Sequence, residues 1–136
     1  MVAPFVAPTP MTVPAVATDS SDTTVVGKAP YAGTVTSVTY TPDTLITGAN
    51  TDSRTVSLVN RKQDGSGTTT IATLAFVSGV NAAAFDEKAI TLSVTPADLV
   101  IAEGDILSWV STAVGTGLAD PGGLVNVVMS RTQTPG

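Results

Sequence analysis

From Thr23 onward the apolar residues of this chain recur at every second position, and this alternation constrains the fold more than any other feature. Successive side chains of a β-strand point to opposite faces of the sheet, so a period of two predicts strands with one buried face. The alternating positions are rich in Val and Thr, which favour strands, and helical periodicity is nearly absent. The expected strands are residues 24–28, 34–41, 54–61, 68–77, 88–95, 99–101, 105–112 and 124–131.

Turn-forming residues lie between these strands, where the chain is expected to reverse. Asp64-Gly65 predicts a hairpin, and Asp120-Pro121-Gly122-Gly123 has Pro and Gly at the second and third positions of a type II turn. Glu103-Gly104-Asp105 predicts a further bend. A short helical turn is expected only at residues 81–87, which contain three consecutive alanines. The pattern as a whole predicts an all-β fold, an antiparallel β-sandwich.

The inward positions of the strands define an expected core. Trp109 is placed in it because a single Trp in a β-sandwich is usually a packing residue; the alternative is a platform on which a sugar ring stacks. The expected core residues are Val35, Val38, Tyr40, Val56, Leu58, Ile71, Leu74, Phe76, Phe85, Ile90, Leu92, Val94, Leu99, Ile101, Ile106, Trp109, Val125, Val127 and Met129.

The first part of the chain has a different composition, rich in Pro, Ala, Val and Thr. Its four prolines fix φ and remove amide donors, so residues 1–18 are expected to be extended and to lie outside the sheets. We therefore expect an extended arm at residues 1–22, a β-sandwich domain at 23–131 and a C-terminal tail at 132–136. Either the arm anchors the protein to a partner surface, or it is a floppy tail with incidental apolar residues. The candidate anchoring side chains are Val2, Phe5, Val6, Met11, Val13 and Val16.

Composition also excludes several classes of function. The chain has no His and no Cys, so the Ser-His-Asp and Cys-His arrangements and ordinary zinc sites have no ligands or bases. No catalytic residue and no cofactor is expected. A net charge of −5 makes nucleic acid an improbable partner. The absence of Lys and Arg before Lys28, together with the prolines, argues against a signal peptide or membrane span.

Loop aspartates raise the question of a calcium site. Turn chemistry accounts for them, and no loop has the alternating Asp pattern of a dedicated site, so no metal is expected. These residues are Asp43, Asp52, Asp64, Asp86, Asp98, Asp105 and Asp120.

Charged residues make up only 12% of the chain, against about 25% in average proteins. An isolated soluble surface normally carries more charge, so part of the exterior is expected to be covered by other protein. The alternative is a monomer coated with Thr and Ser.

Several segments together carry a resemblance to a known group of proteins. They are Gly33-Thr34-Val35-Thr36-Ser37-Val38-Thr39-Tyr40-Thr41-Pro42, Thr47-Gly48-Ala49-Asn50, Arg54-Thr55-Val56-Ser57-Leu58-Val59-Asn60-Arg61 and Glu103-Gly104-Asp105-Ile106-Leu107. This set resembles the small β-sandwich decoration (cement) and head-fibre proteins of tailed phages, over about residues 33–131. Gly104-Asp105 before an apolar strand also resembles the Gly-Asp step of trimeric jelly rolls of the tumour-necrosis-factor and complement type.

The resemblance implies a jelly-roll-like, non-enzymatic virion protein on the capsid exterior. Its implied partners are the major capsid protein and further copies of itself, as a homotrimer, with the arm making the attachment. The alternative from another class is a carbohydrate- or receptor-binding module of a phage fibre or tail, using Trp109, Tyr31 or Tyr40. A tail-tube or baseplate subunit is a third possibility.

Overall fold

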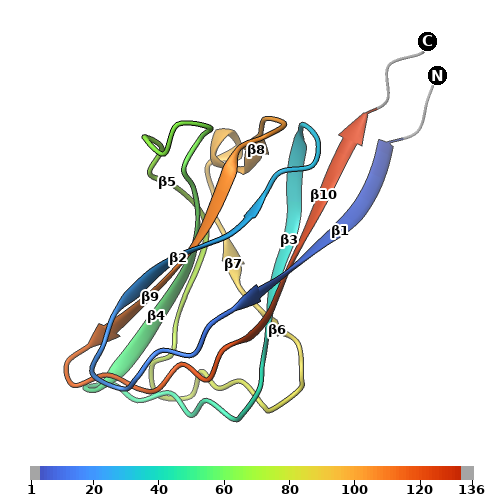
Figure 1. The fold of residues 1–136 in the computed structure, drawn as a ribbon. Coiled ribbons are helices and arrows are strands. Elements are labelled where there is room, and N and C mark those ends of the chain that lie inside the picture. The colour runs from blue at the N-terminus through green and yellow to red at the C-terminus, as the bar shows by residue number, and fades with distance from the viewer. Residues whose placement is uncertain (1–3, 133–136) are drawn as a thin grey trace.

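The fold is that of a computed structural model, which describes residues 4–132 and consists of two five-stranded antiparallel sheets packed face to face (Figure 1). The first sheet has the order β1 (Pro4–Val13), β10 (Gly123–Thr132), β3 (Gly33–Pro42) and β6 (Lys88–Ala89), and β8 (Val100–Ile101) also pairs with β3. The second sheet has the order β2 (Asp22–Lys28), β9 (Ile106–Val114), β4 (Ser53–Asn60), β5 (Thr69–Ala75) and β7 (Thr91–Leu92).

The path of the chain through the two sheets is that of a jelly roll. The chain crosses from one sheet to the other after every strand except β4, and its last strand returns to lie beside its first. Two Greek keys wound in this way define the jelly-roll sandwich. The predicted class, an all-β antiparallel sandwich of jelly-roll type, is therefore confirmed.

All the segments predicted as strands contain strands, but two local predictions are wrong. The segment predicted as one strand at 88–95 holds two short strands, β6 in the first sheet and β7 in the second. The helical turn predicted at 81–87 is absent, because Ala82 is paired with Ile46 through backbone hydrogen bonds of 2.8 and 2.9 Å. The helical element that the described residues do contain is a short 3-10 helix, η1 (Pro96–Leu99).

The boundary predicted at residue 22 does not separate an arm from the sandwich. Residues 4–13 are extended, as expected, but they form β1, which pairs with β10 from Pro4 opposite Thr132 to Val13 opposite Gly123. Prolines are tolerated there because β1 is an edge strand, and an edge strand needs donors on one side only. At the other end, Thr132 belongs to β10 and not to a tail, and residues 133–136 lie outside the described part of the chain.

The prolines of β1 all lie at even-numbered positions, so their backbone groups all point to the same edge of the strand. Backbone groups of successive residues point alternately to the two edges of a strand. The Ile90 N–H donates to the Val38 carbonyl at 2.9 Å, so Val38 faces β6. Its β10 partner Val127 therefore faces β1, and the partner of Val127, Thr9, faces β10. Odd-numbered residues of β1 thus pair with β10, and the even-numbered residues, including all three prolines, face the open edge.

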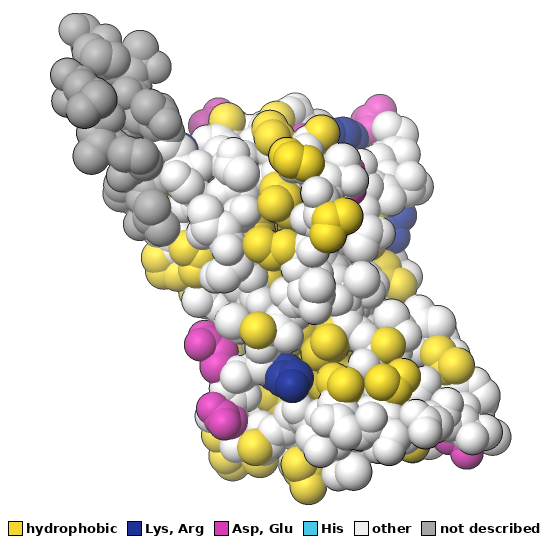
Figure 2. All heavy atoms as spheres, turned by 180° about the vertical axis from the view of Figure 1, so that it is seen from behind, with side chains coloured by type: hydrophobic (Ala, Val, Ile, Leu, Met, Phe, Trp, Pro, Cys, Tyr) yellow, Lys and Arg dark blue, Asp and Glu magenta, His cyan; other side chains and the backbone are white. Residues whose placement is uncertain are grey.

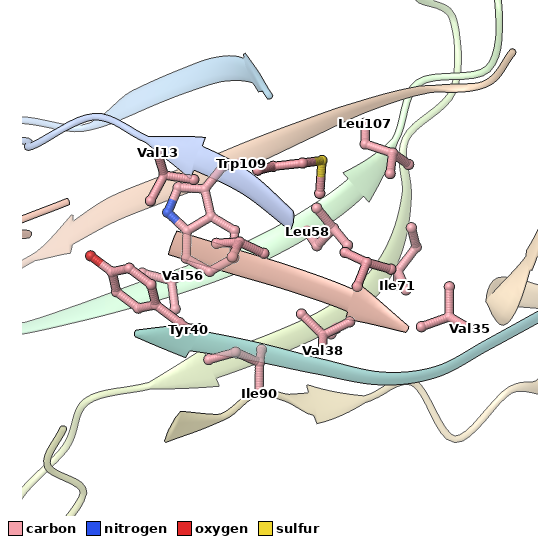
Figure 3. Packing of buried hydrophobic residues seen from close by; sticks show 14 of the residues in the cluster. Val13, Val35, Val38, Tyr40, Val56, Leu58, Ile71, Ile90, Leu107 and Trp109 are labelled. Atoms are coloured by element: carbon pink, nitrogen blue, oxygen red, sulfur yellow. The ribbon is translucent and has the colours of Figure 1, made fainter. Parts of the chain in front are cut away.

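The core lies between the two sheets and is built from the inward-pointing phase of each strand (Figure 3). The rings of Tyr40 and Trp109 pack against each other within it, with centroids 5.3 Å apart. Most predicted core residues are buried, and Leu74, Leu92, Leu99 and Ile106 are partly buried. The prediction is wrong for Phe85 and Val94, which are 80% and 96% exposed. Both lie in irregular segments, where the period of two no longer identifies the buried face.

The phase of β1 can be tested with two threonines of the same strand. Thr9→Pro removes an amide that faces β10, and we expect it to lower the free energy of unfolding by about 2 kcal/mol, the cost of an unpaired backbone partner. Thr12→Pro removes an amide that faces the open edge, and we expect a change of less than about 0.5 kcal/mol. Urea denaturation of both variants measures the difference. Equal losses in the two variants would show that the phase is wrong.

Candidate interaction surface

Three of the predicted anchoring side chains are buried within the protein itself. Met11, Val13 and Val16 are 5%, 2% and 8% exposed. Met11 and Val13 point inward from β1 and belong to the core, and the backbone of Val16 pairs with that of Asp120. The prediction that these three side chains cover a partner surface is therefore wrong in this fold, because β1 completes the sandwich and buries them.

The other three predicted anchoring residues lie at the start of the chain. Phe5 and Val6 belong to β1, where they stand opposite Arg131 and Ser130 of β10. Their side chains, and the whole of Val2, lie outside the described residues. The outer end of β1 thus remains a predicted contact region.

The three aromatic residues considered for sugar stacking are buried. Trp109 is 2% exposed, Tyr40 is 0% exposed and Tyr31 is 8% exposed. The Tyr31 hydroxyl donates to the Met129 carbonyl at 3.2 Å, inside the first sheet. The interpretation of Trp109 as a core residue is confirmed, and a sugar platform built from these three residues is excluded because no ligand can reach their rings.

The most exposed large apolar side chain of the described residues, Val94, lies on the segment that closes one side of the sandwich. Residues 88–101, which we call the strap, pass from the first sheet (β6) to the second (β7), through η1, and back to the first (β8). The strap exposes Val94 by 96% and Val100 by 56%, beside the partly buried Leu92 and Leu99. We call these four residues the apolar side. Figure 2, which shows the molecule from behind, has hydrophobic side chains gathered toward both ends of this face, with few charged ones among them.

A groove of about 560 Å³ runs next to the apolar side, between β5 and the strap. Half of its lining residues are threonines, and its one acidic residue, Asp98, accepts a hydrogen bond of 2.6 Å from the Ser93 hydroxyl. A groove lined by methyl and hydroxyl groups, with little charge, suits a protein surface better than an ionic ligand. The lining residues are Thr68, Thr69, Thr70, Ala72, Thr73, Thr91, Leu92, Ser93, Val94 and Asp98.

A second hollow, of about 310 Å³, lies at the end of the sandwich where β3 and β10 meet the loops. Phe85 stands at its rim, held by a hydrogen bond of 2.9 Å from its N–H to the Pro42 carbonyl. Its φ of 59° is in the left-handed region, which is unfavourable for a bulky side chain and is found preferentially at functional sites. Thr12, Thr41 and Asp43 contribute oxygen atoms to the same hollow.

Four polar side chains form a buried hydrogen-bonded network. Arg, Ser, Asp and Tyr side chains also occur in active sites, but here solvent does not reach them. The Arg54 guanidinium, 0% exposed, donates to Ser111 Oγ at 2.9 Å, and Ser111 Oγ donates to Asp120 Oδ2 at 2.7 Å. The Tyr40 hydroxyl donates to Asp120 Oδ1 at 2.5 Å. Burial and, secondarily, the Asp120 carboxylate raise the pKa of Tyr40 well above its ordinary value, so its hydroxyl stays protonated. All four side chains are buried, and their hydrogen bonds connect β3, β4 and β9 to the segment before β10.

Arg54 ties the segment after β1 to the second sheet. Its guanidinium donates to the carbonyls of Ala17, Thr18 and Ser20 at 2.9, 3.2 and 3.0 Å, and its Nε also donates to the Leu118 carbonyl. Burial lowers the pKa of Arg54 from its ordinary value, and the nearby Asp120 carboxylate opposes that shift. The alternation contains a signal for this position, because Arg54 shares the inward phase of Val56 and Leu58.

Two of the loop aspartates accept hydrogen bonds from other loop residues. Asp64 accepts from the Ser66 hydroxyl and N–H, and Asp52 accepts from the Thr116 N–H; these bonds lower the pKa of both carboxyls. Among the described residues, no three Asp or Glu side chains gather closely enough to hold a metal ion. Within residues 4–132, no helix has the length and apolar character needed to cross a membrane.

The arginine network makes a prediction about stability. Arg54→Met leaves four carbonyls and Ser111 Oγ without their donor and removes the positive charge beside Asp120, so we expect a loss of about 3–5 kcal/mol of unfolding free energy. Arg61→Met is the matched control, because Arg61 directly follows the same strand, is partly exposed, and its side chain donates to Ser108 Oγ at 2.8 Å; we expect a loss of about 1 kcal/mol or less. Denaturant titration measures both. A small loss in Arg54→Met would show that the network does not hold the loops.

Comparisons with known proteins identify no family for the chain. No family model matches it, and no curated protein matches it. A search of solved structures finds a chain of Desmodium yellow mottle tymovirus, with 13% sequence identity and a TM-score of 0.39, covering 100% of this chain and 91% of that chain. A TM-score this low does not establish a shared fold. The jelly-roll assignment therefore rests on the strand order of this chain alone.

Proposed function

We propose that this protein is a non-enzymatic structural component of a virion, a decoration (cement) protein that binds the outer surface of a phage head and stabilises it. Its partners in this proposal are the major capsid protein and further copies of the chain, arranged as a homotrimer. The resemblance in the sequence supports the phage assignment, and the fold and surface described here support an assembly role.

The jelly-roll fold is compatible with several classes of protein function and does not by itself decide between them. Jelly rolls occur in viral capsid proteins, in lectin domains and in cupins, and a fold alone does not determine a function. A metal enzyme of ordinary type needs imidazole or thiolate ligands, and the sequence has neither His nor Cys. A lectin that stacks sugars on Trp or Tyr is disfavoured because those side chains are buried. The assembly class fits the remaining features best.

The observation that carries the proposal is the apolar side. Val94 is 96% exposed on a segment that is tied to both sheets, so its exposure is not that of a loose loop. Covering a valine side chain stabilises a contact by about 1.5–3 kcal/mol before ordering costs, and an interface repeated over many copies multiplies the gain through avidity. The low charge of the chain reduces the desolvation cost of such contacts.

The attachment differs from the arm first expected. Met11, Val13 and Val16 are unavailable, so the proposed contacts are the apolar side and the outer end of β1, which includes Phe5 and Val6. The strap is held at both of its ends, and it thus offers a preordered surface that loses little conformational entropy on binding.

The proposal predicts that charge on the apolar side blocks assembly. We expect Val94→Asp with Val100→Asp to leave the fold intact, because both side chains are exposed, and to weaken binding by at least about 100-fold. The measurements are sedimentation velocity of the protein alone and co-sedimentation with capsids of the encoding virus. Val25→Asp is the control, since Val25 is 68% exposed on β2, in the opposite part of the second sheet. Unchanged binding by the double variant would refute the apolar side as the contact.

A carbohydrate- or receptor-binding role is the second candidate, and the hollow beside Phe85 favours it. An exposed aromatic ring next to Thr12, Thr41 and Asp43 offers one stacking face and several oxygen atoms for hydroxyl groups.

This second role predicts that Phe85→Ala abolishes binding on a glycan array while Val94→Asp does not. Phe85 is 80% exposed, so we expect the substitution to leave stability within about 0.5 kcal/mol of the wild type. An array on which the wild-type protein binds no glycan would exclude this role.

A further inference from the structure

The outer edge of β1 is the longest free edge in the described part of the molecule. β1 spans Pro4–Val13 and pairs only with β10, without a bulge of its own. A long, flat edge strand is a template for another strand, because its outward N–H and C=O groups are unpaired. Such an edge would let a second copy of this chain join its own β1 and merge the two sheets.

The other edges are interrupted. β2, at the edge of the second sheet, has a register shift between Val25 and Gly27 and carries Asp22 and Lys28 at its ends. A bulge and charged residues both discourage edge pairing. On the far side of the sandwich, the strap contributes the two-residue strands β6, β7 and β8, which are too short to template a new strand.

The phase of β1 shows what its free edge offers to an incoming strand. The residues that face it are the even-numbered ones, from Pro4 to Thr12, and only Val6 and Thr12 among them have an N–H. Pro8 and Pro10 leave a stretch of roughly 20 Å between these two donors. A strand added to this edge would find carbonyl acceptors throughout, but its own carbonyls opposite Pro8 and Pro10 would have no donor.

We propose that Pro8 and Pro10 are a barrier that prevents a second copy of this chain from extending the first sheet at β1. Copies of the protein then associate through side chains on their surfaces and keep their sheets separate. The inference does not depend on the virion role, because it follows from the register of β1 and the chemistry of proline.

The test is to restore the missing donors. In sedimentation velocity, P8T/P10T is expected to form dimers or larger species at a concentration about tenfold or more below that of the wild type. In hydrogen exchange, the amides of residues 6–12 are expected to become protected as the protein associates. P30T/P96T is the matched control, because Pro30 and Pro96 are exposed and lie outside any sheet edge; it is expected to sediment like the wild type.

The same substitutions in the V94D/V100D background separate this inference from the proposed function. Association caused by edge pairing persists there, whereas association through the apolar side is lost. Sedimentation of P8T/P10T identical to that of P30T/P96T would overturn the inference. Unfolding of P8T/P10T would also overturn it, since the restored amides point away from β10 and take no part in its pairing.

Discussion

The pairing of β10 with both β1 and β3 is the interaction on which the first sheet depends. β1 and β3 do not pair with each other, so without the last strand of the sandwich its first strand has no place in the sheet. Val125, Val127 and Met129 of β10 are fully buried and connect this pairing to the core. Contacts between the two ends of a chain are slow to form, because loop closure comes before the contacts that reward it. The first sheet is therefore expected to be completed late in folding.

Buried Arg54 holds the end of the first sheet at which β1 ends and β10 begins. Asp120 lies just before β10, its backbone pairs with Val16, and its carboxylate accepts from Tyr40 and Ser111. Arg54 then connects Ser111 to the carbonyls that follow β1. A charged side chain thus holds both the exit from β1 and the entry to β10 against the second sheet. The stabilisation comes from saturated hydrogen bonding in a buried site, where any unpaired group is costly.

Alternation located the longer strands from β2 onward, but it joined the two-residue strands β6 and β7, which belong to different sheets, into one. Arg54 shares the inward phase of Val56 and Leu58, but it was not among the expected core residues, because its charge argues for the surface. β1 was missed because its prolines indicate a segment outside a sheet, and the phase that makes them acceptable at an edge cannot be seen before its partner strand is known. Phe85 and Val94 were misassigned to the core for a related reason. Both residues lie outside the strands, where the chain turns or passes from one sheet to the other. In such segments the sequence period does not tell which side chains point into the core.

The position of the two chain ends has a mechanical consequence. Pro4 stands opposite Thr132, so the outer ends of β1 and β10 lie at the same corner of the sandwich (Figure 1). A force that pulls these two ends apart loads the β1–β10 pairing in an unzipping geometry. The hydrogen bonds between the two strands then break one after another, starting at Pro4 and Thr132. Tension between distant points of the two sheets would instead have to shear many bonds together. If a viral shell used this protein to resist internal pressure, the load would have to pass through the faces and edges of the two sheets. The outer ends of β1 and β10 would have to carry no tension.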